Sequence, residues 1–166
     1  MGDWMSDCLR DWAGADAAFQ NAGGIRNDIA KGPVTLREIY EVMPFDNTLV
    51  VLRMAGRDVR EVLDNGVSGG HGMVQVSGVD LVYDPKAPEG KRVVSARIGG
   101  KPLQDDQVYK VATSDFMTMG GDGYNGFAKA KETDKKDVLL REVLTQCARK
   151  GAIAPPPSGR LHAGGL

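Results

Sequence analysis

The chain of 166 residues is long enough for about one domain with a normal hydrophobic core. It is 42% hydrophobic and 26% charged, as soluble globular proteins are, and its net charge is −1. Positive and negative residues are interspersed without a basic stripe, so we expect no nucleic-acid partner, and no apolar run is long enough for a membrane span.

The spacing of apolar residues predicts the elements of the first half of the chain. Thr35 and Glu38 have the spacing of a capping box, in which two side chains satisfy free amides at the start of a helix. The run from Thr48 to Met54 is β-branched and apolar, which indicates a buried strand. The expected elements are a helix over 3–13, a strand over 17–20, a helix from 36 to 42, a strand over 48–54 and a helix that ends before 66.

Hairpins dominate the second half, where Gly99-Gly100 has the composition of a two-residue hairpin turn. Asp137 is expected to cap a final helix that Gly151 closes. That helix would place five residues on one face: Val138, Leu139, Val143, Leu144 and Cys147. Strands are expected over 73–77, 79–83, 93–98 and 109–113, with a short last strand at 160–161. We therefore predict an α+β fold with a mixed, largely antiparallel sheet and flanking helices.

Cysteine and histidine are scarce in this chain. Cys8 and Cys147 lie far apart in helical patterns, and a buried free thiol is favoured over a disulfide for each. The two histidines are His71, in a glycine-rich loop, and His162, near the C-terminal end. Motifs such as D-x-H, H-E-x-x-H and C-x-x-C are absent from the sequence, so we predict that the chain carries no metal site of its own.

The glycine-rich segment Asn21-Ala22-Gly23-Gly24-Ile25-Arg26 is the first candidate site. Tandem glycines allow a positive φ and a close approach of ligand to the backbone. The Arg26 guanidinium is a planar fork of donors that suits phosphate or carboxylate. The alternatives are a simple turn with a surface arginine, and an Asn21 that braces the loop rather than donating to phosphate.

The second candidate cluster is Pro44-Phe45-Asp46-Asn47, and the third runs from Asp115-Phe116 to Gly120-Gly121-Asp122-Gly123-Tyr124. Phe45 stands between a predicted helix and a strand, and Phe116 follows the strand over 109–113. Each is either a minor core residue or a platform on which a planar heterocycle stacks. Asp122, between two glycines, is either a turn residue or an acceptor for a ribose diol. Asn47 either reads the edge of a base or caps its turn.

Taken together, these clusters resemble the C-terminal domain of bacterial and animal 5′-nucleotidases. The matching motifs are N-x-G-G-I-R at 21–26, V-M-P-F-D-N at 42–47, Q-V-S-G at 75–78 and Y-x-V-A-T-S-D-F-x-x-x-G-G-D-G-Y at 109–124. They occur in the order that the family has, and the resemblance extends from Gly2 to Leu161.

The resemblance implies roles for seven substrate-binding residues and for no catalytic one. Phe45 and Phe116 match the rings that sandwich the base, Asp122 matches the carboxylate that holds the ribose hydroxyls, and Asn47 matches a polar residue beside the base. Asn21 and Arg26 match residues that face the phosphate, where Arg26 would also contact the transition state. Gly24 is included among the substrate-binding residues.

The resemblance further implies that this chain is one part of a larger hydrolase. Residues 1–162 would be an N-terminally truncated substrate-binding domain, and 163–166 a disordered tail. A separate N-terminal metallophosphoesterase domain, absent here, would hold two divalent metals and hydrolyse nucleoside phosphates, so the isolated chain would be inactive. Relatives of this architecture also act on cyclic nucleotides and nucleotide sugars. The parent would be periplasmic or extracellular, although this sequence shows no signal peptide. The alternative is a non-catalytic nucleoside-binding or interaction module of the same fold.

Overall fold

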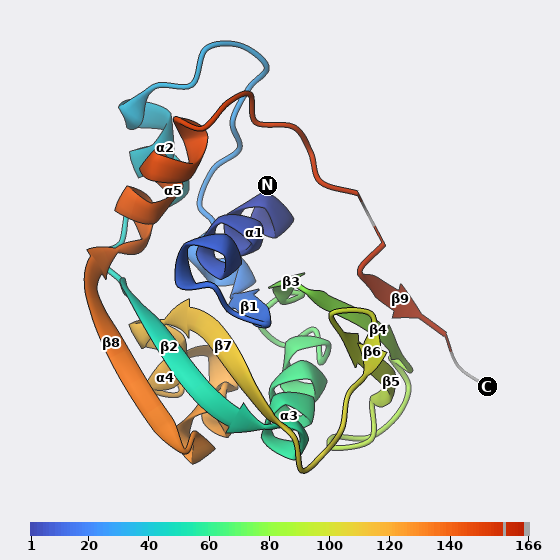
Figure 1. Ribbon diagram of the computed structural model, residues 1–166. Coiled ribbons are helices and arrows are strands. Elements are labelled where there is room, and N and C mark those ends of the chain that lie inside the picture. Colours follow the sequence, from blue (N-terminus) through green and yellow to red (C-terminus); the bar gives the residue numbers. More distant parts are fainter. Residues whose placement is uncertain (158, 165–166) are drawn as a thin grey trace.

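Two mixed β-sheets form the framework of the computed structural model, which describes residues 1–157 and 159–164 (Figure 1). The first sheet has the strand order β3-β1-β7-β2-β8 and the second has the order β6-β5-β4-β9. The strands are β1 (Ala17–Gln20), β2 (Thr48–Ala55), β3 (Gln75–Ser77), β4 (Val79–Tyr83), β5 (Val93–Ile98), β6 (Lys101–Pro102), β7 (Val108–Ser114), β8 (Glu132–Leu139) and β9 (Leu161–Ala163). Two pairs, β1 with β7 and β4 with β9, are parallel, and the others are antiparallel.

Helices flank these sheets, which confirms the predicted α+β class. They are α1 (Gly2–Ala13), α2 (Leu36–Val42), α3 (Gly56–Gly66), α4 (Asp115–Thr118) and α5 (Leu140–Ala148), with short 3₁₀ turns η1 (Ala22–Gly24), η2 (Gly121–Gly123) and η3 (Asn125–Lys129). The capping box of α2 is present as predicted, with Thr35 and Glu38 each accepting from the other's backbone amide. No described helix combines the length and the apolar character that crossing a membrane requires.

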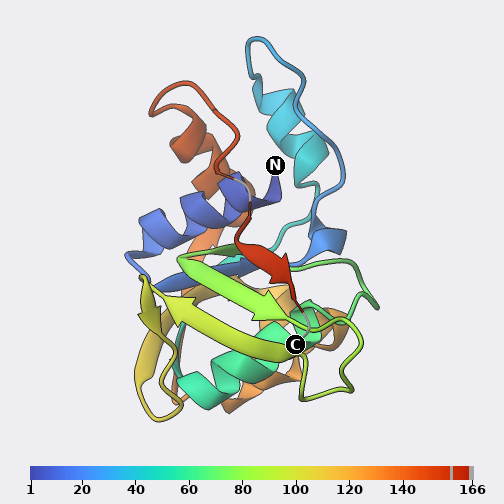
Figure 2. The ribbon, with the colours of Figure 1, turned by 90° about the vertical axis from the view of Figure 1, so that its right-hand side faces the viewer.

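The five-stranded sheet is covered on both faces, which explains the continuous apolar run of β2. Val50, Leu52 and Met54 belong to one core cluster, which also includes α3 and apolar residues of the second sheet. Leu49 belongs to another cluster, built from α1, α2 and α5. Helix α3 therefore lies between the two sheets, and α1 and α5 lie on the opposite side of β2 (Figures 1 and 2).

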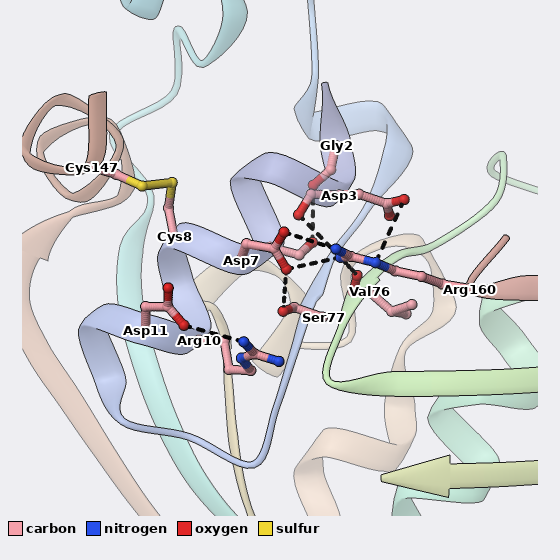
Figure 3. A network of polar contacts seen from close by, with 11 residues as sticks. Gly2, Asp3, Asp7, Cys8, Arg10, Asp11, Val76, Ser77, Cys147 and Arg160 are labelled. Atoms are coloured by element: carbon pink, nitrogen blue, oxygen red, sulfur yellow. Dashed lines mark hydrogen bonds and ion pairs between the residues drawn. A yellow bond between two sulfur atoms is a disulfide. The ribbon is translucent and has the colours of Figure 1, made fainter. Parts of the chain in front are cut away.

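The prediction of free thiols was wrong, because Cys8 of α1 and Cys147 of α5 form a disulfide (Figure 3). Their Cα atoms are 5.7 Å apart, although 139 residues separate them in the chain. Helical spacing alone gives the face on which each cysteine lies, and it does not reveal that the first and last helices pack against each other.

The start of the final helix was also predicted wrongly. Asp137 lies inside β8, and α5 begins at Leu140 and ends at Ala148, before Gly151. Strand β8 pairs with β2 at the edge of the sheet, and most of its residues are exposed and charged. Such charges are usual on edge strands, where they discourage pairing with other chains, and they conceal the strand from a search for apolar runs.

The last described segment is fastened to α1. Arg160 donates through both terminal nitrogens to the Asp7 carboxylate, at 2.9 and 2.8 Å, and also to the Val76 carbonyl oxygen at 2.6 Å (Figure 3). The expected short strand follows as β9, which runs alongside β4 (Figure 2). Ala163, assigned to a disordered tail, belongs to this strand, and residues 165–166 of that predicted tail lie outside the described residues.

Candidate functional site

All three candidate clusters lie at the same end of the five-stranded sheet, where β1 and β7 end and β2 begins. Strand β2 begins at Thr48 and the antiparallel β7 ends at Ser114, with Leu49 opposite Ser114. Strand β1 is parallel to β7, so its last residue, Gln20, lies at that end of the sheet as well. The loops that follow β1 and β7 therefore lie next to the loop that precedes β2.

The glycine loop after β1 is held by a buried asparagine. Asn21 is only 3% exposed, and its side-chain amide donates to Oδ2 of Asp122 at 2.6 Å. Its side-chain oxygen accepts from the side-chain amide of Gln20 at 2.9 Å, and its backbone carbonyl oxygen accepts from the Gly24 N–H at 3.2 Å. Of the two roles considered for Asn21, the structure therefore shows the bracing contact, and this contact reaches directly to the third cluster.

The tandem glycines are required for close packing and not for a positive φ. Neither Gly23 nor Gly24 is among the residues with a positive φ, so the conformational reason given from the sequence was wrong. A Cβ on Gly24 would lie 2.4 Å from Nε2 of Gln20 and 2.8 Å from Oδ1 of Asn21. A Cβ on Gly23 would lie 3.3 Å from Oδ2 of Asp122. The loop thus packs tightly against the side chains that brace it.

Asp122 has an uncommon backbone conformation for a residue with a side chain, with φ 54°. Its carbonyl oxygen accepts from the Asn65 side chain at 3.2 Å, and its carboxylate remains about one-fifth exposed. Nδ1 of His71 lies 3.8 Å from the other carboxylate oxygen, Oδ1. Burial, and secondarily the charge of Asp122, raises the pKa of the neighbouring Tyr124 well above its ordinary value.

Arg26 follows the tandem glycines, and its side chain lies beside Phe45, which is in the loop between α2 and β2. The guanidinium carbon of Arg26 is 6.0 Å from the centroid of the Phe45 ring, within the range of a cation–π contact. Nη1 of Arg26 also donates to the Gly23 carbonyl oxygen at 3.3 Å, and the side chain stays exposed. Because Gly23 adjoins Asp122, Arg26 links the Phe45 loop to the Asp122 cluster.

The loop that carries Phe45 is fastened to the start of α5. Nη1 of Arg141 donates to the Phe45 carbonyl oxygen at 3.0 Å, and its other terminal nitrogen pairs with Asp46. The Leu140 N–H donates to the Asn47 carbonyl oxygen at 2.9 Å. Asn47 therefore does help to fix its turn, through its backbone, and its side chain is half-buried.

Phe45 and Phe116 are exposed by 42% and 37%, whereas Phe19 and Phe127 are buried in the core. The Phe116 ring lies against the backbone of Gly121, where an added Cβ would be 2.4 Å from ring carbon Cε1. Ring pairs among the described residues involve Phe19, Tyr124 and Phe127, so Phe45 and Phe116 are not stacked on each other. Both side chains are thus partly exposed at one end of the sheet.

Three residues that support this site were given no role in the sequence analysis, although one of them, Asp115, lies in the third cluster. Asp115 joins two clusters, since its carboxylate accepts from the Thr48 N–H at 3.2 Å and from the Thr48 hydroxyl at 3.0 Å. Asn65 supports Asp122, and Arg141 supports Phe45. The sequence holds a weak signal for Asp115, which directly precedes Phe116, whereas nothing in its pattern distinguishes Asn65 or Arg141 from ordinary polar helix residues.

A separate cavity of about 930 Å³ lies between α1, the loop before α2 and the segment after α5. None of the seven predicted site residues lines it.

Within residues 1–157 and 159–164, no group of three histidine, cysteine or acidic side chains is arranged to hold a metal ion. The side chains that the candidate site offers to a ligand are the Phe45 and Phe116 rings, the Asp122 carboxylate and the Arg26 guanidinium, at one end of the sheet.

Comparison with known proteins decides the family. The model of the 5′-nucleotidase C-terminal domain matches residues 1–129. The chain belongs to this family. It is 34% identical to the trifunctional nucleotide phosphoesterase protein YfkN of Bacillus subtilis, over 97% of this chain and 12% of that protein. It is 39% identical to protein UshA of Yersinia enterocolitica, over 83% of this chain and 25% of that protein.

Solved structures of this family have the same fold. The crystal structure of a 5′-nucleotidase precursor from Thermus thermophilus superimposes with a TM-score of 0.91 at 32% identity, over 98% of this chain and 34% of that one. The Haemophilus influenzae NAD nucleotidase superimposes with a TM-score of 0.87 at 25% identity, over 99% of this chain and 33% of that one. This 5′-nucleotidase C-terminal domain thus spans about a third or less of the relatives that it matches.

Proposed function

We propose that this chain is the nucleotide-binding domain of a 5′-nucleotidase-type hydrolase, which removes phosphate from nucleoside monophosphates or related nucleotides. The observation that supports it most is that two exposed phenyl rings, Phe45 and Phe116, lie at the same end of the sheet, where Phe116 packs on Gly121, the neighbour of Asp122. Relatives with names such as 5′-nucleotidase and nucleotide phosphoesterase agree with this proposal.

The rings would bind the base from its two faces. Stacking of a base on an aromatic side chain contributes about 1–3 kcal/mol and tolerates every base. Thr48 and Asp115 hold the two ring-bearing loops together, so the clamp would be largely preformed. Asn47, which lies between Phe45 and Thr48, would contact the edge of the base.

The sugar and phosphate would extend from the rings along the glycine loop. Oδ1 of Asp122 accepts no hydrogen bond from the described residues and would accept from the ribose hydroxyls, while Asn21 keeps that carboxylate in place through Oδ2. The exposed guanidinium of Arg26 would meet the phosphate, while Gly24 lets the loop pack closely enough to hold Asn21. The contribution of this chain is thus positioning of the substrate.

A titration of ¹⁵N-labelled protein with adenosine and with AMP tests the clamp. We expect the resonances of Phe45 and Phe116 to shift, with a Kd on the order of 1 mM. Phe45→Ala and Phe116→Ala should each weaken binding at least about fivefold. Val94→Ala, at a similarly exposed apolar residue of β5, should leave binding unchanged. Wild-type spectra in which both rings remain unperturbed would contradict the proposal.

The hydrolytic step belongs to the parent protein in this proposal. Two divalent metals in an N-terminal metallophosphoesterase domain would supply the attacking water, and the described residues of this chain offer no ligand set for such metals. We assign no step through metals to this chain and expect the isolated domain to release no phosphate from AMP. Metal-dependent hydrolysis by the purified chain, absent from a mock purification, would overturn that expectation.

The parent would act in the periplasm or outside the cell. The Cys8–Cys147 disulfide supports this location, because disulfides persist in oxidising compartments. The alternative is a non-catalytic nucleoside-binding module. It would be correct if nucleosides bind to the domain and the larger proteins that contain this domain do not hydrolyse nucleotides.

A further inference from the structure

The two carboxylate oxygens of Asp122 have different surroundings. Oδ2 accepts a hydrogen bond of 2.6 Å from Asn21. Oδ1 accepts no hydrogen bond from the described residues, and Nδ1 of His71 stands 3.8 Å away, beyond hydrogen-bonding distance. Asp122 is thus held through one oxygen, and the other faces an imidazole without contacting it.

His71 is carried by a loop that is anchored to the site at both ends. The Ser68 N–H donates to the carbonyl oxygen of Asn65, whose side chain donates to the backbone of Asp122. At the other end, Gly72 approaches the glycine loop so closely that an added Cβ would lie 2.8 Å from that of Ala22. The loop therefore has fixed ends on either side of Asp122, while the His71 side chain itself is 63% exposed.

The separation of 3.8 Å is suited to a ligand that both side chains bind. A neutral imidazole has one donor and one acceptor nitrogen, and a carboxylate only accepts. Two neighbouring hydroxyl groups could donate to Oδ1 of Asp122 and exchange a hydrogen bond with His71 at the same time. A ribose carries such a pair at its 2′ and 3′ carbons, whereas a deoxyribose lacks one member of it.

We propose that His71 is a further ligand-binding residue, which shares the ribose diol with Asp122 and makes the site select ribosides over deoxyribosides. This inference rests on the proposed function, since it requires a nucleoside at the site. It adds to that function a specificity-determining side chain that supplies a donor, where Asp122 supplies only acceptors.

The imidazole resonances give a direct test, because the chain has only two histidines. Adenosine should shift the ring signals of His71 and leave those of His162, on β9, unchanged. The 2′-deoxy and 3′-deoxy analogues should shift His71 less. Shifts at Phe45 and Phe116 without any at His71 would overturn this inference and leave the proposed function intact. Absence of adenosine binding to wild-type protein would overturn both.

Variants give the second test. His71→Ala should weaken adenosine binding about fivefold, the factor expected for loss of one hydrogen bond, and should hardly affect binding of the deoxy analogues. His71→Gln keeps a donor and should recover part of the loss, while His162→Ala should bind as wild type does. If His71→Ala retains the wild-type preference for adenosine over both deoxy analogues, His71 does not select the sugar.

Discussion

Thr48 donates twice to one carboxylate: its N–H lies 3.2 Å from Oδ1 of Asp115, and its hydroxyl lies 3.0 Å from Oδ2. Asn47 directly precedes Thr48, and Phe116 directly follows Asp115. The pair therefore fixes the loop of one exposed phenyl ring relative to the loop of the other, at the point where β2 begins and β7 ends.

Removing this link should loosen the site as well as the fold. Asp115→Ala leaves a half-buried N–H and hydroxyl of Thr48 without an acceptor, so we expect a loss of about 1–3 kcal/mol in the free energy of unfolding. Thr48→Val, which keeps the N–H, should lose about 1 kcal/mol. Urea denaturation measures both. Asp106→Ala breaks an exposed ion pair with Arg57 and is the control; an equally small effect of Asp115→Ala would contradict the role of this link.

A methyl group at Gly24 should disturb the bracing of Asp122. The added Cβ would fall 2.4 Å from Gln20 and 2.8 Å from Asn21, and both side chains are buried. We expect Gly24→Ala to destabilise the protein by about 1–3 kcal/mol and to weaken adenosine binding. Gly70→Ala has room for its methyl group and should unfold at nearly the wild-type urea concentration. Wild-type stability of Gly24→Ala would show that the loop can shift without cost.

Arg141 should act on nucleoside binding through Phe45. It donates to the Phe45 carbonyl oxygen, pairs with Asp46, and places its guanidinium 4.7 Å from the Tyr40 ring centroid. Arg141→Met keeps much of the apolar stem but removes these contacts, so we expect weaker adenosine binding and altered Phe45 resonances. The matched control is Arg37→Met, because Arg37 is highly exposed on α2. Equal affinities of the two variants would argue against this positioning role.

The disulfide should contribute strongly to stability. A cross-link between residues 139 positions apart stabilises the fold by about 5 kcal/mol when only the entropy of the unfolded chain is considered. Replacement of Cys8 and Cys147 together by serine should therefore lower the midpoint of urea unfolding markedly. Reductant should lower the midpoint of the wild type and leave that of the double variant unchanged. An unchanged midpoint of urea unfolding for wild-type protein whose disulfide has been fully reduced would contradict this expectation.

Tyr124 should make the protein less stable at high pH. Its pKa is raised in the folded state above the ordinary 10.0, chiefly by burial and further by the charge of Asp122. Above pH 10, the Tyr124 hydroxyl therefore keeps its proton in the folded state and loses it in the unfolded state. The contribution of Tyr124 to the free energy of unfolding is complete below pH 10 and declines above it, by up to about 1.4 kcal/mol per pH unit. Urea unfolding between pH 9 and 11 should give a shallower decline for Tyr124→Phe; parallel declines would contradict the expectation.

Much of the fold could be predicted because local patterns encode it. The capping box at Thr35, the β-branched run from Thr48 and the Gly99-Gly100 hairpin turn each specify an element through contacts between near neighbours in the chain. Strand β8 was missed because its residues carry the charges of a solvent-facing edge, and the strand is stabilised by pairing with β2.

The sequence by itself determined which residue types are available for binding: two phenylalanines beside strand ends, an aspartate between glycines, and an arginine after a glycine turn. Only the tertiary structure decided that the segments carrying these four residues lie at one end of the sheet, because the order of β1, β7 and β2 brings those strand ends together. It alone decided that Cys8 meets Cys147 and that Asn21 reaches Asp122, since such contacts depend on how distant segments pack, and side-chain spacing along the chain carries no record of that packing.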